Sequence, residues 1–468
     1  MCLPVFAVVG HPNKGKSSIV ATLARDDSVL VAPDPGTTTK SRSYPLRIDG
    51  QLLYTLVDTP GFQRPRRALA WMKQHATSVV KRPQVVRAFV QTHQPRGEFP
   101  DECELLHPLI EGAGILYVID GSRPYGQEYE AEMEILRWTG QPSMALINPI
   151  ADESHVEEWT VALGQYFKVV RVFDAVTAEF DKRLELLRAF GQLQQRWSAA
   201  LDRAVASLEA DRARRYTRSA RAIAELLVDM MTTNVIKKLP ARTDPAPHRD
   251  ALAKAFQDRL RKRERAGRQT IERIYGHYQI KRSESAMDLI DQDLFSQQSW
   301  LLWGLSRRQL LATGVASGAV IGGGLDVSVG GTSFLFGTVV GAAVGGASAW
   351  LSYNRIINVK VLGLPLGGVE LRAGPIGNKN FPYVVVGRAL YHHRLVSGRT
   401  HAQREDLSVD HSASIGGSSA FSDAQRLDLE RCFTKLRRSR DEQTTSRECE
   451  KLAEWLNREG FDPADRSS

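Results

Sequence analysis

The chain lacks the cysteine and leader patterns that mark secreted or zinc-binding proteins. Its 468 residues include four widely separated cysteines, at Cys2, Cys103, Cys432 and Cys449. No C-x-x-C pair or Cys/His ligand spacing occurs, so neither a zinc site nor a disulfide framework is indicated. The apolar run near the N-terminus has no basic residues before it, which indicates a first strand and not a signal peptide. We therefore expect a cytoplasmic protein.

A strong charge of one sign is also missing. The excess of Lys and Arg gives a net charge of only +9 at pH 7. Such an excess suits nucleic acid or anionic lipid, but a soluble protein with a basic surface is the commoner explanation and the one we favour. The composition, 42% apolar and 25% charged, is that of a folded protein. At this length we expect two or three domains.

Residues 1–190 alternate short β-rich runs with helical stretches, the pattern of a doubly wound α/β domain. The expected strands are Val5–Val9, Ser43–Ile48, Leu52–Val57, Ile115–Ile119, Met144–Ile147 and Val169–Phe173. Asp49 and Gly50 join the second and third strands as a hairpin. The basic, proline-punctuated stretch between Phe62 and Gly112 is long for a connection, and we expect a mobile insert with helical pieces.

Three further regions follow this domain. Residues 191–308 form a heavily charged helical region, and residues 309–354 carry a single charged residue, Asp326. Residues 355–468 have a mixed pattern, with a polar tail that closes in a helical segment from Ala424 to Arg458. The predicted architecture is an α/β domain followed by a mostly α-helical C-terminal part.

The segment GHPNKGKSS follows the first strand and precedes the helical stretch SSIVATLAR. It fits the phosphate-loop pattern G-x-x-x-x-G-K-[ST] at its four required positions, Gly10, Gly15, Lys16 and Ser17. The glycines let backbone N–H groups face phosphate, Lys16 reaches the β and γ oxygens, and Ser17 ligates Mg²⁺. The other nucleotide-binding residues predicted in the loop are Asn13, Lys14 and Ser18.

Two further motifs fall where a phosphate-dependent switch needs them. PDPGTTTK contains Thr38, 21 residues after Ser17, whose hydroxyl joins the Mg²⁺ shell only when a γ-phosphate is present. VDTPGF ends the third strand and supplies Asp58 for a Mg²⁺-bound water and the Gly61 N–H for the γ-phosphate. Loss of these γ-phosphate contacts on hydrolysis is the usual order-to-disorder switch.

With these motifs, residues 1–190 resemble a small GTPase of the Era and tRNA-modification (TrmE) group, a P-loop NTPase with a Ras-like doubly wound sheet. The resemblance implies Mg²⁺-dependent binding and hydrolysis of GTP. The catalytic residues it implies are Lys16, Thr38 and Gly61, and the Mg²⁺ ligands are Ser17, Thr38 and Asp58.

Two positions in these motifs carry further implications. Phe62 stands where Ras-like enzymes place a water-orienting glutamine, which implies slow intrinsic hydrolysis. Asn13 matches the loop asparagine that ligates K⁺ in some of these GTPases, where the ion takes the role of an arginine finger. The alternative interpretation is that Asn13 only shapes the loop.

The base-recognition motif of this group, N-K-x-D, is not matched. The fifth strand ends at Asn148, and the next carboxylate, Asp152, comes one residue too late. Asn148 is predicted to meet the guanine N7 edge, and Asp152 is either a base ligand brought in by a bulge or an ordinary helix cap. Asp174 and Ala175 replace the usual Ser-Ala pair. Guanine preference therefore comes from the resemblance, and ATP stays open.

Glycines recur at four-residue spacing in the apolar segment 309–354. They form two triplets, Gly314, Gly318 and Gly322, then Gly337, Gly341 and Gly345. On a helix each triplet gives a smooth groove, which predicts a glycine-zipper hairpin. The hairpin either contacts a membrane, as a peripheral or inner-membrane anchor, or is buried in a soluble helical domain. We favour the membrane because so much glycine destabilises a helix in water.

The stretch from Phe381 to Arg394, FPYVVVGRALYHHR, mixes a strand-like run with basic residues. Adjacent histidines point to different faces of a helix, so a metal site is not expected. A basic face for lipid phosphate or a partner competes with an ordinary solvated face, which we favour. Together with the other motifs, this stretch makes the whole chain resemble bacterial GTPases that carry a C-terminal domain of unknown function.

These observations predict a Mg²⁺-dependent GTPase switch, with GTP and GDP as ligands, whose loaded state reorganises a membrane-associated helical domain. One alternative is an Era-like RNA- or ribosome-associated GTPase that uses the basic helices at 258–283. It is less favoured, because no G-x-x-G clamp or stacking aromatics accompany those residues. Another is a nucleotide-gated structural or pore-forming oligomer with little turnover.

Overall fold

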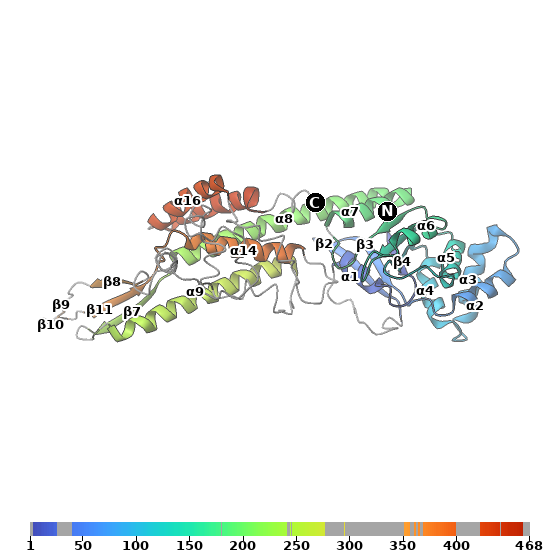
Figure 1. Cartoon of the computed structure of the whole chain (residues 1–468), viewed down its shortest axis with the longest axis horizontal. Helices are drawn as coiled ribbons and strands as arrows, with labels where there is room; N and C mark the ends of the chain where they lie inside the picture. Colours follow the sequence, from blue (N-terminus) through green and yellow to red (C-terminus); the bar gives the residue numbers. More distant parts are fainter. Residues whose placement is uncertain are drawn as a thin grey trace, which may run out of the picture. The chain divides into compact units, whose positions relative to one another are not determined.

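The computed structural model describes the following residues: 3–25, 40–178, 180–240, 244, 246–276, 294, 351–355, 360–361, 364–365, 368–398, 422–439 and 441–461. The chain divides into two compact units, Met1–Ala213 with Gly398–Arg404 and Ser468, and Arg214–Ser397 with Glu405–Ser467. Their helices and strands are labelled in Figure 1.

The first unit is built on a six-stranded mixed sheet of order β2-β3-β1-β4-β5-β6. Its strands are β1 (Val5–Val9), β2 (Arg42–Ile48), β3 (Gln51–Asp58), β4 (Gly114–Asp120), β5 (Ser143–Asn148) and β6 (Val170–Val172). β2 and β3 are antiparallel and the other neighbours are parallel. Asp49 and Gly50, with φ of 51° and 79°, make the tight turn between β2 and β3. The predicted mixed α/β sheet is confirmed.

Helices cover both faces of this sheet (Figure 1). They are α1 (Lys16–Ala24), α2 (Pro65–His75), the short η1 (Val79–Lys81), α3 (Arg82–His93), α4 (Pro100–Ile110), α5 (Glu128–Trp138), α6 (Val156–Gly164), α7 (Phe180–Leu193) and α8 (Gln195–Thr232). Alternate residues of β1 face opposite sides, as a strand requires. Phe6 and Val8 join the core with α1, α7 and α8, whereas Ala7 and Val9 join the core with α2 to α6.

The helical pieces expected between Phe62 and Gly112 are present, but they are packed in the core and do not form a separate mobile insert. The stretch forms α2, α3 and α4, and the side chains of Phe89, Leu105 and Leu106 are fully buried. Pro65, Pro83 and Pro100 stand in the first turns of these three helices, where a missing N–H costs little. Pro95 lies in the turn between α3 and α4, and Pro108 lies inside α4.

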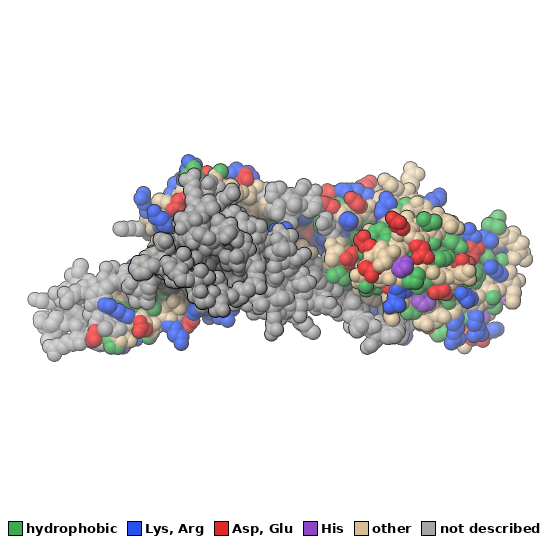
Figure 2. Space-filling model, viewed as in Figure 1, with side chains coloured by type: hydrophobic (Ala, Val, Ile, Leu, Met, Phe, Trp, Pro, Cys, Tyr) green, Lys and Arg blue, Asp and Glu red, His purple; other side chains and the backbone are tan. Residues whose placement is uncertain are grey.

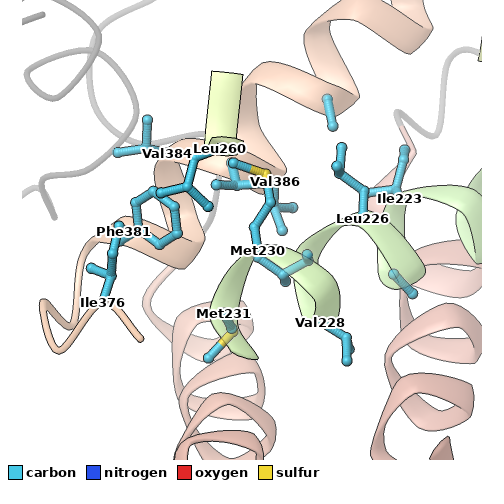
Figure 3. Packing of buried hydrophobic residues seen from close by; sticks show 14 of the residues in the cluster. Ile223, Leu226, Val228, Met230, Met231, Leu260, Ile376, Phe381, Val384 and Val386 are labelled. Atoms are coloured by element: carbon cyan, nitrogen blue, oxygen red, sulfur yellow. The ribbon is translucent and has the colours of Figure 1, made fainter. Parts of the chain in front are cut away.

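The second unit combines long helices with a small sheet. Its helices are the C-terminal part of α8, α9 (Ala246–Tyr275), α14 (Phe381–Gly398), α16 (Asp423–Arg438), α17 (Glu442–Trp455) and the short η4 (Leu456–Gly460). Its strands are β7 (Val235–Pro240), β8 (Leu351–Arg355), β9 (Lys360–Val361), β10 (Leu364–Pro365) and β11 (Gly368–Ala373). β11 pairs antiparallel with β7 and β8. Figure 3 shows the core between Met230 of α8, Leu260 of α9 and Phe381 of α14.

Several expectations for the second half of the chain need correction. The strand-like run after Phe381 lies in helix α14, where its β-branched side chains fill the core. The favoured solvated face is wrong, because Arg388, His392 and His393 are buried. The helical region 191–308 contains strand β7, and the closing helical segment is two helices, α16 and α17.

The glycine-zipper prediction falls almost wholly outside the described residues. Only its end is described, and residues 351–354 are part of strand β8, not of a helix. Within the described ranges, no helix is long and apolar enough to cross a membrane. Acidic and basic side chains are intermixed on the described surface seen in Figure 2.

Candidate nucleotide-binding site

The loop between β1 and α1 has the backbone that a phosphate-binding loop requires. Gly10 and Gly15 have positive φ angles of 145° and 79°. A Cβ on Gly10 would lie 2.4 Å from the carbonyl oxygen of Val118, and a Cβ on Gly15 would lie 2.2 Å from the Nδ2 of Asn148. The two glycines are therefore fixed by backbone conformation and by close approach to β4 and β5.

Lys16 begins helix α1 and is buried beneath this loop, with 7% of its surface exposed. Its Nζ donates to the carbonyl oxygens of His11 at 2.9 Å and Gly10 at 3.3 Å. Burial lowers the pKa of Lys16 to about 8, although the charges of Asp58 and Glu132 act in the opposite direction. The ammonium therefore lies at the loop, bound to two carbonyls that a phosphate oxygen can replace.

Ser17 and Asp58 come together from two elements, as predicted. The Ser17 hydroxyl, in the first turn of α1, donates to Asp58 Oδ2 at the end of β3 over 2.8 Å. Asp58 is only 3% exposed. A hydroxyl and a carboxylate oxygen are the hard ligands that Mg²⁺ prefers, so this pair fits the ion. Thr38 lies outside the described residues.

The segment after β3 lies against the phosphate loop. A Cβ on Gly61 would lie 2.6 Å from the backbone nitrogen of Pro12, so only glycine fits there. The next N–H, that of Phe62, donates to the Gly10 carbonyl oxygen over 3.2 Å. The Phe62 side chain is fully buried in the core beside α2 to α6, so it does not reach a water at the loop.

At the end of β5, where the sequence predicts base binding, Asn148 ties this strand to two loops. Its Nδ2 donates to the Lys14 carbonyl oxygen over 3.3 Å, and its Oδ1 accepts from the Ala175 N–H over 3.2 Å. Asp152 is exposed and lies in a turn before α6, where its Oδ1 accepts from the Ser154 N–H over 2.9 Å. The structure thus brings Asn148 to the phosphate loop, whereas Asp152 is engaged in its own turn.

Comparison with protein families assigns both parts of the chain. Residues 161–456, more than half of it, match the family described as a domain of unknown function, DUF3482. The chain belongs to this DUF3482 family. Residues 5–148 match the family described as 50S ribosome-binding GTPase. The DUF3482 protein therefore carries an Era/Der-like GTPase domain followed by a C-terminal domain of unknown function, which confirms the resemblance noted from the motifs.

Individual relatives match only parts of the DUF3482 protein. GTPase Der of Nitrosococcus oceani is 48% identical over 64 residues, 14% of each chain. GTPase Der of Halorhodospira halophila is 34% identical over 123 residues, 25% of each chain. Among Der relatives like these, the matches span from 13% to 34% of the relative's length.

Two solved structures of Era were also compared with the DUF3482 protein. An Era variant of Aquifex aeolicus bound to GDP.AlF4- is 17% identical, with 59% of this chain and 90% of that chain covered and a TM-score of 0.28. Era in complex with MgGDPNP and nucleotides 1506–1542 of 16S ribosomal RNA is 16% identical, with the same coverage and TM-score.

The GTPase domain of the DUF3482 protein also buries a carboxylate that the motifs did not reveal. Glu132 of α5 accepts from the Tyr117 hydroxyl over 2.9 Å and lies 2.8 Å from Nδ1 of His11 in the phosphate loop. Burial raises the pKa of Glu132, an effect that its bond to His11 and the charge of Lys16 partly offset. The available signal was an acidic residue on the apolar face of an otherwise regular helix.

Lys14 is a second buried cation of the loop. Its Nζ lies 3.9 Å from Asp120 Oδ2 at the end of β4, and only 7% of the residue is exposed. Burial lowers the pKa of Lys14, although the charge of Asp120 raises it in part. Asn13 has a left-handed backbone with φ of 60° and is exposed, and its role as a K⁺ ligand stays a prediction.

Proposed function

We propose that this DUF3482 protein is a Mg²⁺-dependent GTP hydrolase that works as a molecular switch. The observation that carries the proposal is the meeting of Ser17, Asp58 and Lys16 at one loop, because hydroxyl, carboxylate and ammonium supply the metal ligands and the phosphate charge in the same place.

The residues of the site would divide the work of phosphoryl transfer. Lys16 exchanges the loop carbonyls for the β and γ oxygens, and the α1 N-terminus faces the phosphates with its dipole. The N–H of Gly61 faces the γ-phosphate from the opposite side. Ser17 and Asp58 would hold Mg²⁺, which neutralises charge as water attacks the γ-phosphate in line. Positioning and charge neutralisation supply most of the catalysis.

Slow intrinsic turnover follows from the burial of Phe62, since that side chain orients no water. A bound cation at Asn13 is one way to supply the missing positive charge. Replacing KCl by NaCl at equal ionic strength tests this: K⁺ participation predicts slower hydrolysis in NaCl, and equal rates exclude it.

The decisive experiment measures phosphate release from GTP and ATP by the full chain and by the Lys16→Ala variant. We expect the variant to lose hydrolysis by about a hundredfold or more, the cost of removing one charged transition-state contact. Lys73→Ala, on the exposed face of α2, is the matched control and should keep the wild-type rate. Full activity in Lys16→Ala would exclude this site. Equal rates with GTP and ATP would show that the protein is a nucleotide hydrolase without selectivity for guanine.

We further propose that the nucleotide state controls the C-terminal domain and that the segment 309–354 brings the protein to a membrane surface. The glycine spacing in the sequence supports this proposal. Flotation with anionic vesicles, in GDP and in a non-hydrolysable GTP analogue, should differ between nucleotides and require this segment. Absence of flotation together with salt-sensitive RNA binding would favour an RNA-associated GTPase instead.

A further inference from the structure

Helix α4 holds the segment that follows Gly61 through a buried carboxylate. Glu102, in the first turn of α4, is 1% exposed. Its Oε1 accepts a hydrogen bond from the Gln63 N–H at 2.9 Å and another from the Arg64 N–H. Arg64 is the N-cap residue of helix α2, so the carboxylate also lies at the positive end of that helix.

The same helix holds the chain that enters β2. Glu104 Oε1 accepts from the Ser41 N–H over 2.8 Å, and the Ser41 hydroxyl donates to the Glu104 carbonyl oxygen over 3.1 Å. In the sequence, Ser41 comes three residues after Thr38. Helix α4 therefore binds the backbone next to both segments that the motifs assign to the γ-phosphate.

Helix α4 is itself firmly anchored. Cys103, Leu105, Leu106 and Leu109 are at most 2% exposed and belong to the core on one face of the sheet. A helix packed in this way keeps the Glu102 carboxylate at a fixed position, which a carboxylate on a surface loop would not have.

We infer that Glu102 is a positioning residue for nucleotide hydrolysis, an inference that rests on the proposed GTPase function. The chain directly after Gly61 is held by the Phe62 N–H bond to the Gly10 carbonyl oxygen and by Glu102, which accepts from the N–H groups of Gln63 and Arg64. Together these bonds keep the Gly61 N–H beside the phosphate loop, where a γ-phosphate binds and a diphosphate does not reach. Glu102 thereby favours the triphosphate-bound form, and Glu104 ties Ser41, at the entry to β2, to the same helix.

The test compares Glu102→Ala and Glu102→Gln in the full chain. For Glu102→Ala we expect kcat and the affinity for a non-hydrolysable GTP analogue to fall about tenfold, the worth of one charge-assisted hydrogen bond, with GDP affinity within about twofold of wild type. Glu102→Gln should recover most of the loss, because its amide oxygen still accepts from both N–H groups. Glu111→Gln, exposed at the other end of α4, is the control.

A merely structural role would give a different result. It would lower the affinities for GDP and the GTP analogue together, and that outcome, like wild-type kinetics in Glu102→Ala, overturns the inference. Wild-type protein that hydrolyses no GTP would overturn the proposed function instead, so the two failures are distinguishable.

A double-mutant cycle tests the joint role of α4. If Glu102 and Glu104 act through one helix, kcat should fall less in Glu102→Ala/Glu104→Ala than the product of the two single fold-losses in kcat. Losses that simply multiply would show that the two segments are held independently, and would overturn the joint role.

Discussion

The two units of the chain bury charged groups in different arrangements. In the GTPase domain, Lys16, Asp58 and Glu132 gather around one loop, and Lys16 is satisfied by backbone carbonyls that a ligand can replace. In the second unit, buried charges are paired between two helices. Arg388 Nε of α14 lies 2.6 Å from Glu264 Oε1 of α9. Charged groups whose present partners a ligand can replace indicate a ligand site. Charged groups of opposite sign that pair with each other hold two helices together, and we call such a set of pairs a structural lock.

The lock between α9 and α14 continues along both helices. His392 Nε2 lies 3.4 Å from Glu272 Oε1, and the Tyr275 hydroxyl and His393 Nε2 are 2.8 Å apart. Both histidines are 1% exposed. This ladder gives partners to the buried polar residues of the FPYVVVGRALYHHR stretch. Within the described residues, no group of three or more His, Cys, Asp or Glu side chains is placed to hold a metal.

The largest effect that we expect is on the stability of the second unit, when the buried ion pair is removed. Arg388→Ala leaves the buried Glu264 carboxylate without its partner, which should destabilise the unit by about 3–5 kcal/mol in urea unfolding. The double variant Arg388→Leu/Glu264→Leu should recover much of this, because no charge then stays buried. Arg394→Ala, on the exposed face of α14, is the control. A small loss in Arg388→Ala would mean that the pair is not a lock.

The next effect is a pH dependence in the same ladder. Burial, aided by the charge of His392, lowers the pKa of His393 to about 3, so the folded protein keeps this ring neutral. The unfolded chain takes up a proton below about pH 6.5. Stability is therefore lost as the pH falls from about 6.5 towards 3, by up to ~1.4 kcal/mol per pH unit. His393→Gln should remove this part of the slope, measured by urea unfolding at several pH values. An unchanged slope would show that other groups cause the loss of stability at low pH.

The next prediction concerns the protonation of Lys16 in the GTPase domain. With a pKa of about 8, roughly half of the Lys16 side chains are deprotonated at pH 8, and a bound phosphate restores the charge. Nucleotide binding should therefore take up about half a proton at pH 8 and little at pH 6.5. Calorimetry in buffers of different ionisation enthalpy measures this uptake. Lys16→Ala is the control, and proton uptake that does not change between these pH values would contradict the exchangeable ammonium.

The smallest effect is expected at Asp152. Its carboxylate is exposed and bonded within its own turn, so Asp152→Ala should change GTP affinity less than about twofold. Asn148→Ala should weaken binding about tenfold, because the buried amide joins the Lys14 carbonyl oxygen and the Ala175 N–H. Fluorescence titration with labelled GTP and ATP distinguishes the cases. A large and GTP-selective loss in Asp152→Ala would show that this side chain moves to the base.

The sequence was most informative where one local rule decides the structure. The phosphate loop is determined by glycines, and the six strands of the GTPase domain by short apolar runs, so both were predicted almost to the residue. The strands β7 to β11 of the second unit were not predicted. Propensity misled where tertiary packing decides. Three prolines of the Phe62–Gly112 stretch, which indicated a loop, start helices α2, α3 and α4. The valines after Phe381 favoured a strand but fill a helical core. The roles of Glu102 and Glu132 could not be predicted, because their hydrogen-bond partners come from distant segments of the sequence.

The burial of Cys103 beside Glu102 gives helix α4 a built-in chemical reporter. Burial raises the pKa of the Cys103 thiol to about 11, so little thiolate exists at neutral pH, and the side chain is 2% exposed. Alkylating reagents therefore reach this sulfur only when α4 separates from the sheet. Mass spectrometry can follow the labelling rate of the peptide that contains Cys103 as nucleotide is exchanged. This rate measures how often the native protein opens at helix α4.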